Sequence, residues 1–265
     1  MTGWKNWMSS SLHSNFGDEA LVATKNWVRR HLPEQVTGGI EYMLYPDRSM
    51  AWGGPFNGQR SRQDLFYSLV EKFTPVAIVE TGTYLGTTTE FLAATGLPIF
   101  SVESDPRRYG FAKIRLWRRR NVHLMRGDSR ATLQMWFDGP LRWTRNQTLF
   151  VYLDAHWNDD LPLAEELEIV FGACPSAIVM IDDFQVPFDD GYGYDAYGAH
   201  KSLTTELIEP SVAVHSLQVF YPSTPSVQET GLRRGCVVIA SNTMAPRLGS
   251  LPLLRSPAPE ADNRG

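Results

Sequence analysis

Two short apolar segments with a glycine turn between them constrain the fold of this chain more than any other feature. Residues 76–79 predict a buried strand, and Gly82 and Gly86 mark a turn that leads into a helix. A second apolar run, 99–102, ends in the acid Glu103. A strand, a glycine turn, a helix, a second strand and an acid, in this order, indicate a nucleotide-type pocket in an open α/β sheet.

The glycine spacing and the preceding acid indicate which ligand this turn accepts. A dinucleotide fold uses G-x-G-x-x-G and directs a helix N-terminus at a pyrophosphate. Here Gly82 and Gly86 are spaced G-x-x-x-G, and Glu80 precedes them. A carboxylate at Glu80 would repel a pyrophosphate but suits a cationic ligand. The alternative is an ordinary turn that happens to contain two glycines.

This stretch resembles motif I of the class I S-adenosylmethionine-dependent methyltransferases, E/D-x-G-x-x-x-G. The resemblance implies that the turn lines the methionine end of the cofactor and that Glu103 holds the ribose. It also suggests Asp128 and Ser129, after the third predicted strand, as adenine contacts, with helix capping as the alternative. The expected cofactor contacts are Glu80, Thr81, Gly82, Thr83, Tyr84, Gly86, Thr87, Glu103, Asp128, Ser129 and Asp154.

Three aspartates follow two further predicted strands, at the edge where open α/β sheets bind ligands. Asp154 ends one apolar run, and the pair Asp182 and Asp183 ends the next. Carboxylates packed together without compensation repel one another, and a divalent cation would compensate them. Oxygen-only ligands favour Mg²⁺ or Ca²⁺ over zinc. The alternative for the tandem pair is capping of the next element.

These acids resemble the metal ligands of the macrocin and novobiocin sugar O-methyltransferases. The resemblance to this family covers roughly residues 60–240. The resemblance implies that Asp154, Asp182 and Asp183 hold Mg²⁺. His156 stands where the family has an acidic base, and a neutral imidazole is a competent base near pH 7. A structural histidine at the end of a strand is the alternative.

The order of the elements predicts one α/β domain. Strands are expected at 76–81, 99–104, 122–128, 148–154, 177–182, 216–222 and 235–241. Helices are expected at 60–73, 87–95, 106–119, 129–137, 161–172 and 199–209. The resemblance implies a Rossmann-like, seven-stranded, mostly parallel sheet of order 3-2-1-4-5-7-6, with helices on both faces.

The chain divides into three predicted segments. An N-terminal cap segment, 1–59, carries a helix over 18–32 and precedes the methyltransferase domain, 60–243. Residues 244–265 are rich in Pro, Ser, Arg and Ala, which predicts a mobile tail.

Two further segments have a predicted role. Tyrosines, glycines and acids alternate over 187–198, which indicates either a substrate lid or a packed surface loop. Glu165, Glu166 and Glu168 are expected on the first turn and solvated face of a helix, where acids favour the helix dipole.

Composition argues against several classes of function. The formal net charge of −4 gives no strong attraction to nucleic acid or to an anionic membrane. No apolar run approaches the roughly 18 residues of a membrane span, and the N-terminus lacks a signal-peptide core. Cys174 and Cys236 lie in apolar contexts, which predicts reduced thiols in a cytoplasmic protein.

The predicted function is S-adenosylmethionine-dependent O-methyl transfer to a small-molecule acceptor, a sugar diol or a phenol, assisted by a divalent cation. A metal-independent methyltransferase and a non-catalytic S-adenosylmethionine-binding protein are the alternatives. A nicotinamide-dependent oxidoreductase is disfavoured by the missing third glycine and by Glu80. Association into a homo-oligomer is left open.

Overall fold

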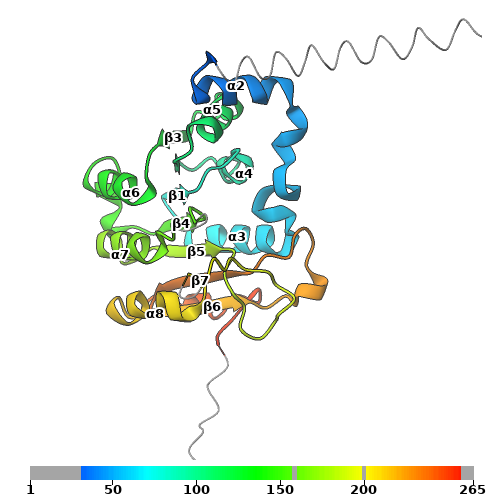
Figure 1. Ribbon diagram of the computed structural model, residues 1–265. Coiled ribbons are helices and arrows are strands. Elements are labelled where there is room, and N and C mark those ends of the chain that lie inside the picture. The colour runs from blue at the N-terminus through cyan, green and yellow to red at the C-terminus, as the bar shows by residue number, and fades with distance from the viewer. Residues whose placement is uncertain (1–30, 157–159, 199–200, 258–265) are drawn as a thin grey trace, which may run out of the picture.

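The computed structural model describes residues 31–156, 160–198 and 201–257. Within them one sheet of eight strands has the order β3-β2-β1-β4-β5-β7-β6-β8. Figure 1 labels β3, β1, β4, β5, β7 and β6 of this sheet. The strands are β1 (Ala77–Thr81), β2 (Ile99–Glu103), β3 (Val122–Arg126), β4 (Leu149–Leu153), β5 (Ile178–Asp182), β6 (Leu217–Pro222), β7 (Cys236–Ser241) and β8 (Leu254–Arg255).

The first five strands are parallel, and β7 runs antiparallel between β5 and β6. This confirms the predicted α/β, Rossmann-like class and the order 3-2-1-4-5-7-6, with β8 added at the edge beside β6. Every residue of β1, β4 and β5 is buried, as expected for parallel strands covered on both faces.

Helices cover both faces of the sheet. They are α2 (Glu34–Leu44), α3 (Arg60–Phe73), α4 (Thr87–Ala93), α5 (Pro106–Arg115), α6 (Ser129–Asp138), α7 (Leu163–Ala173), α8 (Thr205–Val214) and α9 (Ala245–Leu248). Short 3₁₀ segments are η1 (Pro46–Gly53), η2 (Pro55–Gly58), η3 (Arg142–Asn146) and η4 (Ser226–Gln228). None of the helices in the described residues is long and apolar enough to cross a membrane.

Alternate residues of each central strand enter different hydrophobic cores. Val79 and Val151 pack in the core that contains residues of α6, α7 and α8. Ile78 and Phe150 pack in the opposite core, with residues of α3, α4 and α9. The period of two along a strand therefore divides one apolar run between two layers of helices.

The C-terminal prediction was wrong for residues 245–255. Helix α9 and strand β8 lie on the fold, and Leu248, Leu251 and Leu254 are buried in the second core. Three leucines at spacings of three residues are enough to bury one side of a segment that is otherwise rich in Pro, Ser and Arg. Residues 258–265 lie outside the described residues.

The N-terminal segment is joined to the fold by close backbone contact. A Cβ on Gly38 of α2 would lie 1.8 Å from the carbonyl oxygen of Arg107, and one on Gly110 of α5 would lie 1.9 Å from that of Gln35. The Glu41 carboxylate also accepts from the Arg107 guanidinium, Nε to Oε2 at 2.8 Å. The part of the predicted helix over 18–30 lies outside the described residues.

Candidate functional site

A cavity of about 640 Å³ opens at the carboxyl ends of β1, β2, β4 and β5. The predicted cofactor contacts in its wall are Gly82, Thr83, Tyr84, Thr87, Glu103, Asp128, Ser129 and Asp154. Glu80, Thr81 and Gly86 are not among the lining residues. Thus the structure brings most of the predicted contacts together around one cavity.

The two glycines of the turn are required by the backbone. Gly82 has φ +84°, and a Cβ there would lie 2.1 Å from the carbonyl oxygen of Asp154. Gly86 has φ +75° and precedes the first residue of α4, where a Cβ would lie 3.2 Å from Leu116 Cδ1. Any other residue at these positions would be strained, because left-handed φ values favour glycine.

Glu80 lies behind the cavity wall. It is 1% exposed, and one carboxylate oxygen accepts from the hydroxyls of Thr89 on α4 and Ser101 on β2. Burial raises the pKa of Glu80 to about 7, although these two hydrogen bonds lower it. The motif acid therefore ties α4 to the sheet and does not line the cavity.

Glu103 and Asp128 are fixed by backbone donors at the cavity wall. Glu103 accepts from the backbone nitrogens of Tyr84 at 2.6 Å and Asp105 at 2.9 Å, and burial raises its pKa. Asp128 is the N-cap of α6 and accepts from Ala131 N at 3.1 Å. The capping role of Asp128 is therefore present together with its place in the wall.

The segment over the cavity contains several left-handed residues. Trp52, Phe56 and Asn57 have φ values of +59°, +50° and +58°. Phe56 is buried edge-on against Tyr152, whereas Trp52 lines the cavity and is 54% exposed. Strained backbone of this kind is concentrated at ligand clamps, and here it closes one side of the cavity.

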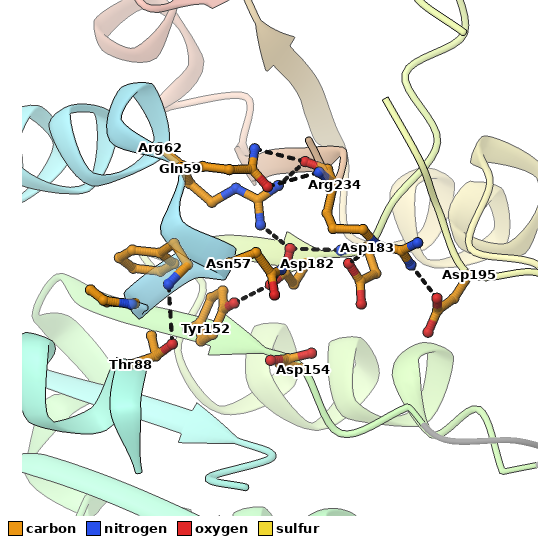
Figure 2. A network of polar contacts seen from close by, with 12 residues as sticks. Asn57, Gln59, Arg62, Thr88, Tyr152, Asp154, Asp182, Asp183, Asp195 and Arg234 are labelled. Atoms are coloured by element: carbon orange, nitrogen blue, oxygen red, sulfur yellow. Dashed lines mark hydrogen bonds and ion pairs between the residues drawn. The ribbon is translucent and has the colours of Figure 1, made fainter. Parts of the chain in front are cut away.

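Asp182 is saturated with hydrogen-bond donors (Figure 2). It is 1% exposed and accepts from four groups: the Arg62 guanidinium, the Tyr152 hydroxyl, Asn57 Nδ2 at 3.1 Å and Asp183 N at 2.8 Å. A carboxylate has about four lone-pair sites, so none remains for a cation. The geometry separates Asp182 from the other two predicted ligands.

Arg62 and Arg234 compensate the acids, and sequence reasoning missed both. Arg62 also donates to the carbonyl oxygen of Arg234. The Arg234 guanidinium in turn bridges two carboxylates (Figure 2). Its Nε donates to Asp183 Oδ1 at 2.6 Å, and its Nη2 donates to Asp195 Oδ1. Burial alone would raise the pKa of Asp183, but His156 and Arg234 outweigh it and hold that pKa at about 2.

A signal for Arg62 was present in the sequence. It occupies the apolar stripe of α3 together with Leu65, Phe66 and Leu69. An arginine at helical spacing with core residues needs a buried acidic partner. No comparable local signal exists for Arg234, which follows a turn.

His156 lies at the centre of a group of carboxylates. Its Nε2 is 3.8 Å from Asp154 Oδ1, Asp183 Oδ2 and Asp195 Oδ2. The residue is 5% exposed, and Nε2 has no hydrogen-bond partner among the residues that the structure describes. Ligand atoms of Asp154, His156 and Asp183 lie within 4.8 Å of one another. We call these three residues and Asp195 the histidine–aspartate cluster.

Asp154 is the carboxylate of this cluster that forms no ion pair with an arginine among the described residues. Its side chain is 31% exposed and lies in the cavity wall. Burial raises its pKa well above the ordinary value, and the charges of Asp182 and Asp183 raise it further. A bound cation would reverse this, because it favours the carboxylate form.

Glu166 is a second residue whose environment the sequence mispredicted. Glu165 and Glu168 are exposed, but Glu166 is 1% exposed. It shares the buried stripe of α7 with Leu163 and Val170, so the helix period turns it inward. Burial raises its pKa, and Ser129 and Thr81 lie beside its carboxyl group.

The tyrosine- and glycine-rich segment 187–198 is a packed loop that contributes to the cavity wall. The Tyr192 side chain is buried and its hydroxyl donates to Thr224 O at 2.9 Å. Asp195 N donates to Asp183 O at 2.9 Å, and the Tyr197 hydroxyl donates to the Asp195 carboxylate. Asp195 and Tyr197 both line the cavity.

No protein-family model and no curated protein sequence matches this chain. Solved structures do resemble it. A Klebsiella pneumoniae protein assigned as an O-methyltransferase is 14% identical over 83% of this chain and 96% of that chain, with a TM-score of 0.49. The methyltransferase domain of bacterial CtHen1 is 13% identical over 68% and 98%, with a TM-score of 0.48.

A Staphylococcus aureus protein assigned as a caffeoyl-CoA O-methyltransferase is 13% identical over 69% of this chain and 84% of that chain, with a TM-score of 0.44. At these scores the similarities do not bear on the chemistry of this chain. The fold class stands on the strand order, and the chemistry on the geometry of the cavity.

Proposed function

We propose that this chain is an S-adenosylmethionine-dependent methyltransferase that acts on a hydroxyl group of a small-molecule acceptor. One observation supports this most strongly. A single cavity connects the glycine turn and Glu103 to the histidine–aspartate cluster, across the carboxyl edge of a sheet of order 3-2-1-4-5-7-6. The donor and the acceptor would therefore meet in one shared cavity.

The chemistry of the wall suits this donor. Glu103, Asp128 and Asp154 line the cavity around the glycine turn together with Arg108, so a pyrophosphate would meet three carboxylates and one guanidinium. S-adenosylmethionine instead brings a sulfonium and an ammonium group, and it has no phosphate. Glu103 would accept from the ribose hydroxyls and Asp128 from the adenine amine, while Gly82 lets the turn pack directly against the Asp154 backbone at the cavity wall.

The residues present fit a divalent cation, but not with the predicted ligand set. Asp182 has no lone pair to offer, whereas His156 Nε2 is buried and lacks a partner among the described residues. A nitrogen lone pair facing carboxylate oxygens is repulsive unless a cation or a proton lies between them. His156, Asp154 and Asp183 would hold the cation. When bound, it would act as a Lewis acid that lowers the pKa of an acceptor hydroxyl.

This assignment changes the predicted role of His156. The same nitrogen cannot hold a cation and accept a proton, so the proton acceptor is Asp195. Its carboxylate lines the cavity beside His156, and Arg234 and the Tyr197 hydroxyl hold it in place. Trp52 lines the cavity on the side of the cap segment.

The test has two stages. Calorimetry with S-adenosylhomocysteine should show binding, and NAD⁺ should show none. A screen of diol and catechol acceptors with labelled S-adenosylmethionine should then identify a methylated product. Binding without turnover on any acceptor would favour the non-catalytic alternative. The absence of S-adenosylhomocysteine binding would overturn the proposed function.

A further inference from the structure

We propose that the cation site is a nitrogen–oxygen centre that selects a first-row transition metal over Mg²⁺, with His156, Asp154 and Asp183 as its protein ligands. The inference rests on the proposed function for its purpose, but its evidence is the geometry, the charge and the donor types of the cluster. It departs from the oxygen-only set that the sequence predicts, because Asp182 leaves the set and an imidazole enters it.

Charge supports a doubly charged occupant. Asp154, Asp182, Asp183 and Asp195 are four carboxylates at this edge of the sheet, and in the described structure they are met by the two guanidinium groups of Arg62 and Arg234. With a neutral His156, two negative charges remain uncompensated. A partly buried surplus of this size is costly, and one divalent cation removes it.

Arg234 presents the carboxylates to a common point. It occupies Oδ1 of Asp183 and Oδ1 of Asp195, and the Oδ2 of each lies 3.8 Å from His156 Nε2. Outer hydrogen-bond partners of this kind orient ligands around metals in proteins. Asp183 also has an unusual, left-handed backbone conformation, with φ +49°.

The spacing favours a small coordination number. Nε2 is 3.8 Å from each carboxylate oxygen. A tetrahedral shell with bonds of about 2.0–2.2 Å places its ligands about 3.3–3.6 Å apart, so the three ligand atoms, which lie within 4.8 Å of one another, would have to draw closer to complete it. An octahedral Mg²⁺ shell with bonds of about 2.0–2.1 Å needs neighbouring ligands about 2.9 Å apart, which is a much larger contraction.

The donor type leads to the same metal class. Imidazole suits Zn²⁺, Co²⁺ and related ions, whereas Mg²⁺ prefers oxygen ligands and retains several waters. Three protein ligands also leave a coordination position open, as in catalytic metal sites. An open position would be reached from the cavity, because Asp154, His156 and Asp183 all line it.

The experiment uses the full chain freed of metal with a chelator. Calorimetry with Zn²⁺, Co²⁺ and Mg²⁺ should show that the first two bind at least about 100-fold tighter than Mg²⁺. His156→Ala should lose this binding by more than about 100-fold, and His156→Asp should shift the preference toward Mg²⁺. His123→Ala, an exposed imidazole on β3, is the matched control and should bind as the parent does.

A measurement on the unmodified chain guards against misfolded variants. Electron spin-echo spectra of the Mn²⁺-loaded protein should show coupling to an imidazole nitrogen. Equal or tighter Mg²⁺ binding, or a spectrum without nitrogen coupling, would overturn the proposal. S-adenosylhomocysteine binding is measured separately. If it is observed but the metal preference is not, the proposed function survives and the metal proposal falls. If the metal preference is observed but S-adenosylhomocysteine does not bind, only the proposed function falls.

Discussion

The Arg62 guanidinium donates to the Asp182 carboxylate across 120 residues of sequence, and both side chains are 2% exposed. This pair joins α3, which follows the cap segment, to the end of β5, where the cavity opens. The same carboxylate accepts from Asn57 in the cap segment. The ion pair therefore holds the cap, the helix and the sheet edge in one arrangement.

Replacing Arg62 should destabilise the protein strongly. Arg62→Met leaves the buried Asp182 carboxylate without its cation, and breaking such a pair typically costs about 3–5 kcal/mol. Urea denaturation followed by circular dichroism measures the change in the free energy of unfolding. Arg60→Met, at the exposed first residue of α3, should change it by less than about 0.5 kcal/mol. A loss below about 1 kcal/mol for Arg62→Met would show that Asp182 takes up a proton instead.

Replacing Glu103 should weaken the binding of S-adenosylhomocysteine, the product formed from the cofactor. Glu103→Ala leaves the ribose hydroxyls and the backbone nitrogens of Tyr84 and Asp105 without an acceptor. The expected loss is about 1–3 kcal/mol in S-adenosylhomocysteine binding, or roughly 5- to 150-fold in Kd. Calorimetry measures it, with the exposed Glu71→Ala as control. Unchanged affinity would remove the ribose assignment.

Glu80 should make the stability of the ligand-free protein depend on pH. Its folded pKa of about 7 lies above the ordinary value of 4.5. An acid with a raised folded pKa stabilises fully below its unfolded pKa, and this stability is lost as pH rises toward 7. The loss amounts to roughly 3 kcal/mol if the full shift is expressed.

Glu80→Gln is the variant that isolates this effect. The amide stays neutral at every pH and its oxygen can still accept from Thr89 and Ser101. Its stability should match the parent near pH 5 and exceed it near pH 8, by urea denaturation at both values. A difference between the two proteins that does not vary with pH would contradict the assignment.

Replacing Asp195 should lower turnover but not metal binding, whereas replacing His156 should weaken metal binding. Asp195→Asn should lower turnover by roughly 10²- to 10⁴-fold, the usual share of general-base catalysis, while metal and S-adenosylhomocysteine binding stay intact. Asp190→Asn, an exposed acid of the same loop, is the control and should be as active as the parent. Initial rates on the acceptor found by the screen measure both.

The opposite pattern would restore the role predicted from sequence. If Asp195→Asn keeps near-normal turnover, and His156→Gln loses turnover but binds metal as the parent does, then His156 is the proton acceptor. In that case the three carboxylates around Nε2 would stabilise the imidazolium that forms.

Much of the fold follows from features that are local in the sequence. The apolar runs at 76–79 and 99–102 became β1 and β2, and the turn at Gly82 and Gly86 took the left-handed conformation that its glycines allow. Hydrophobic periodicity and glycine conformation act over a few residues, so they can be read without knowing the rest of the chain.

Burial of isolated side chains was less predictable. Glu166 reads as one of several acids on a helix, and its inward position depends on which side of α7 packs on the sheet. Leu248 and Leu254 become core residues only because β6 and its neighbours offer an apolar surface to cover. When a segment has few apolar residues, its sequence alone does not show which part of the protein it packs against.

The sequence by itself determined the α/β class, the glycine turn and the gathering of acids at one edge of the sheet. The acids gather because the carboxyl ends of neighbouring parallel strands lie at the same edge. Only the tertiary structure decided how those acids are used. Arg62 reaches Asp182 from 120 residues away and Arg234 reaches Asp183 from 51 residues away. Electrostatic compensation acts through space over a few ångströms, so the difference between a saturated Asp182 and an Asp183 that still presents an oxygen to His156 arises only when distant segments meet.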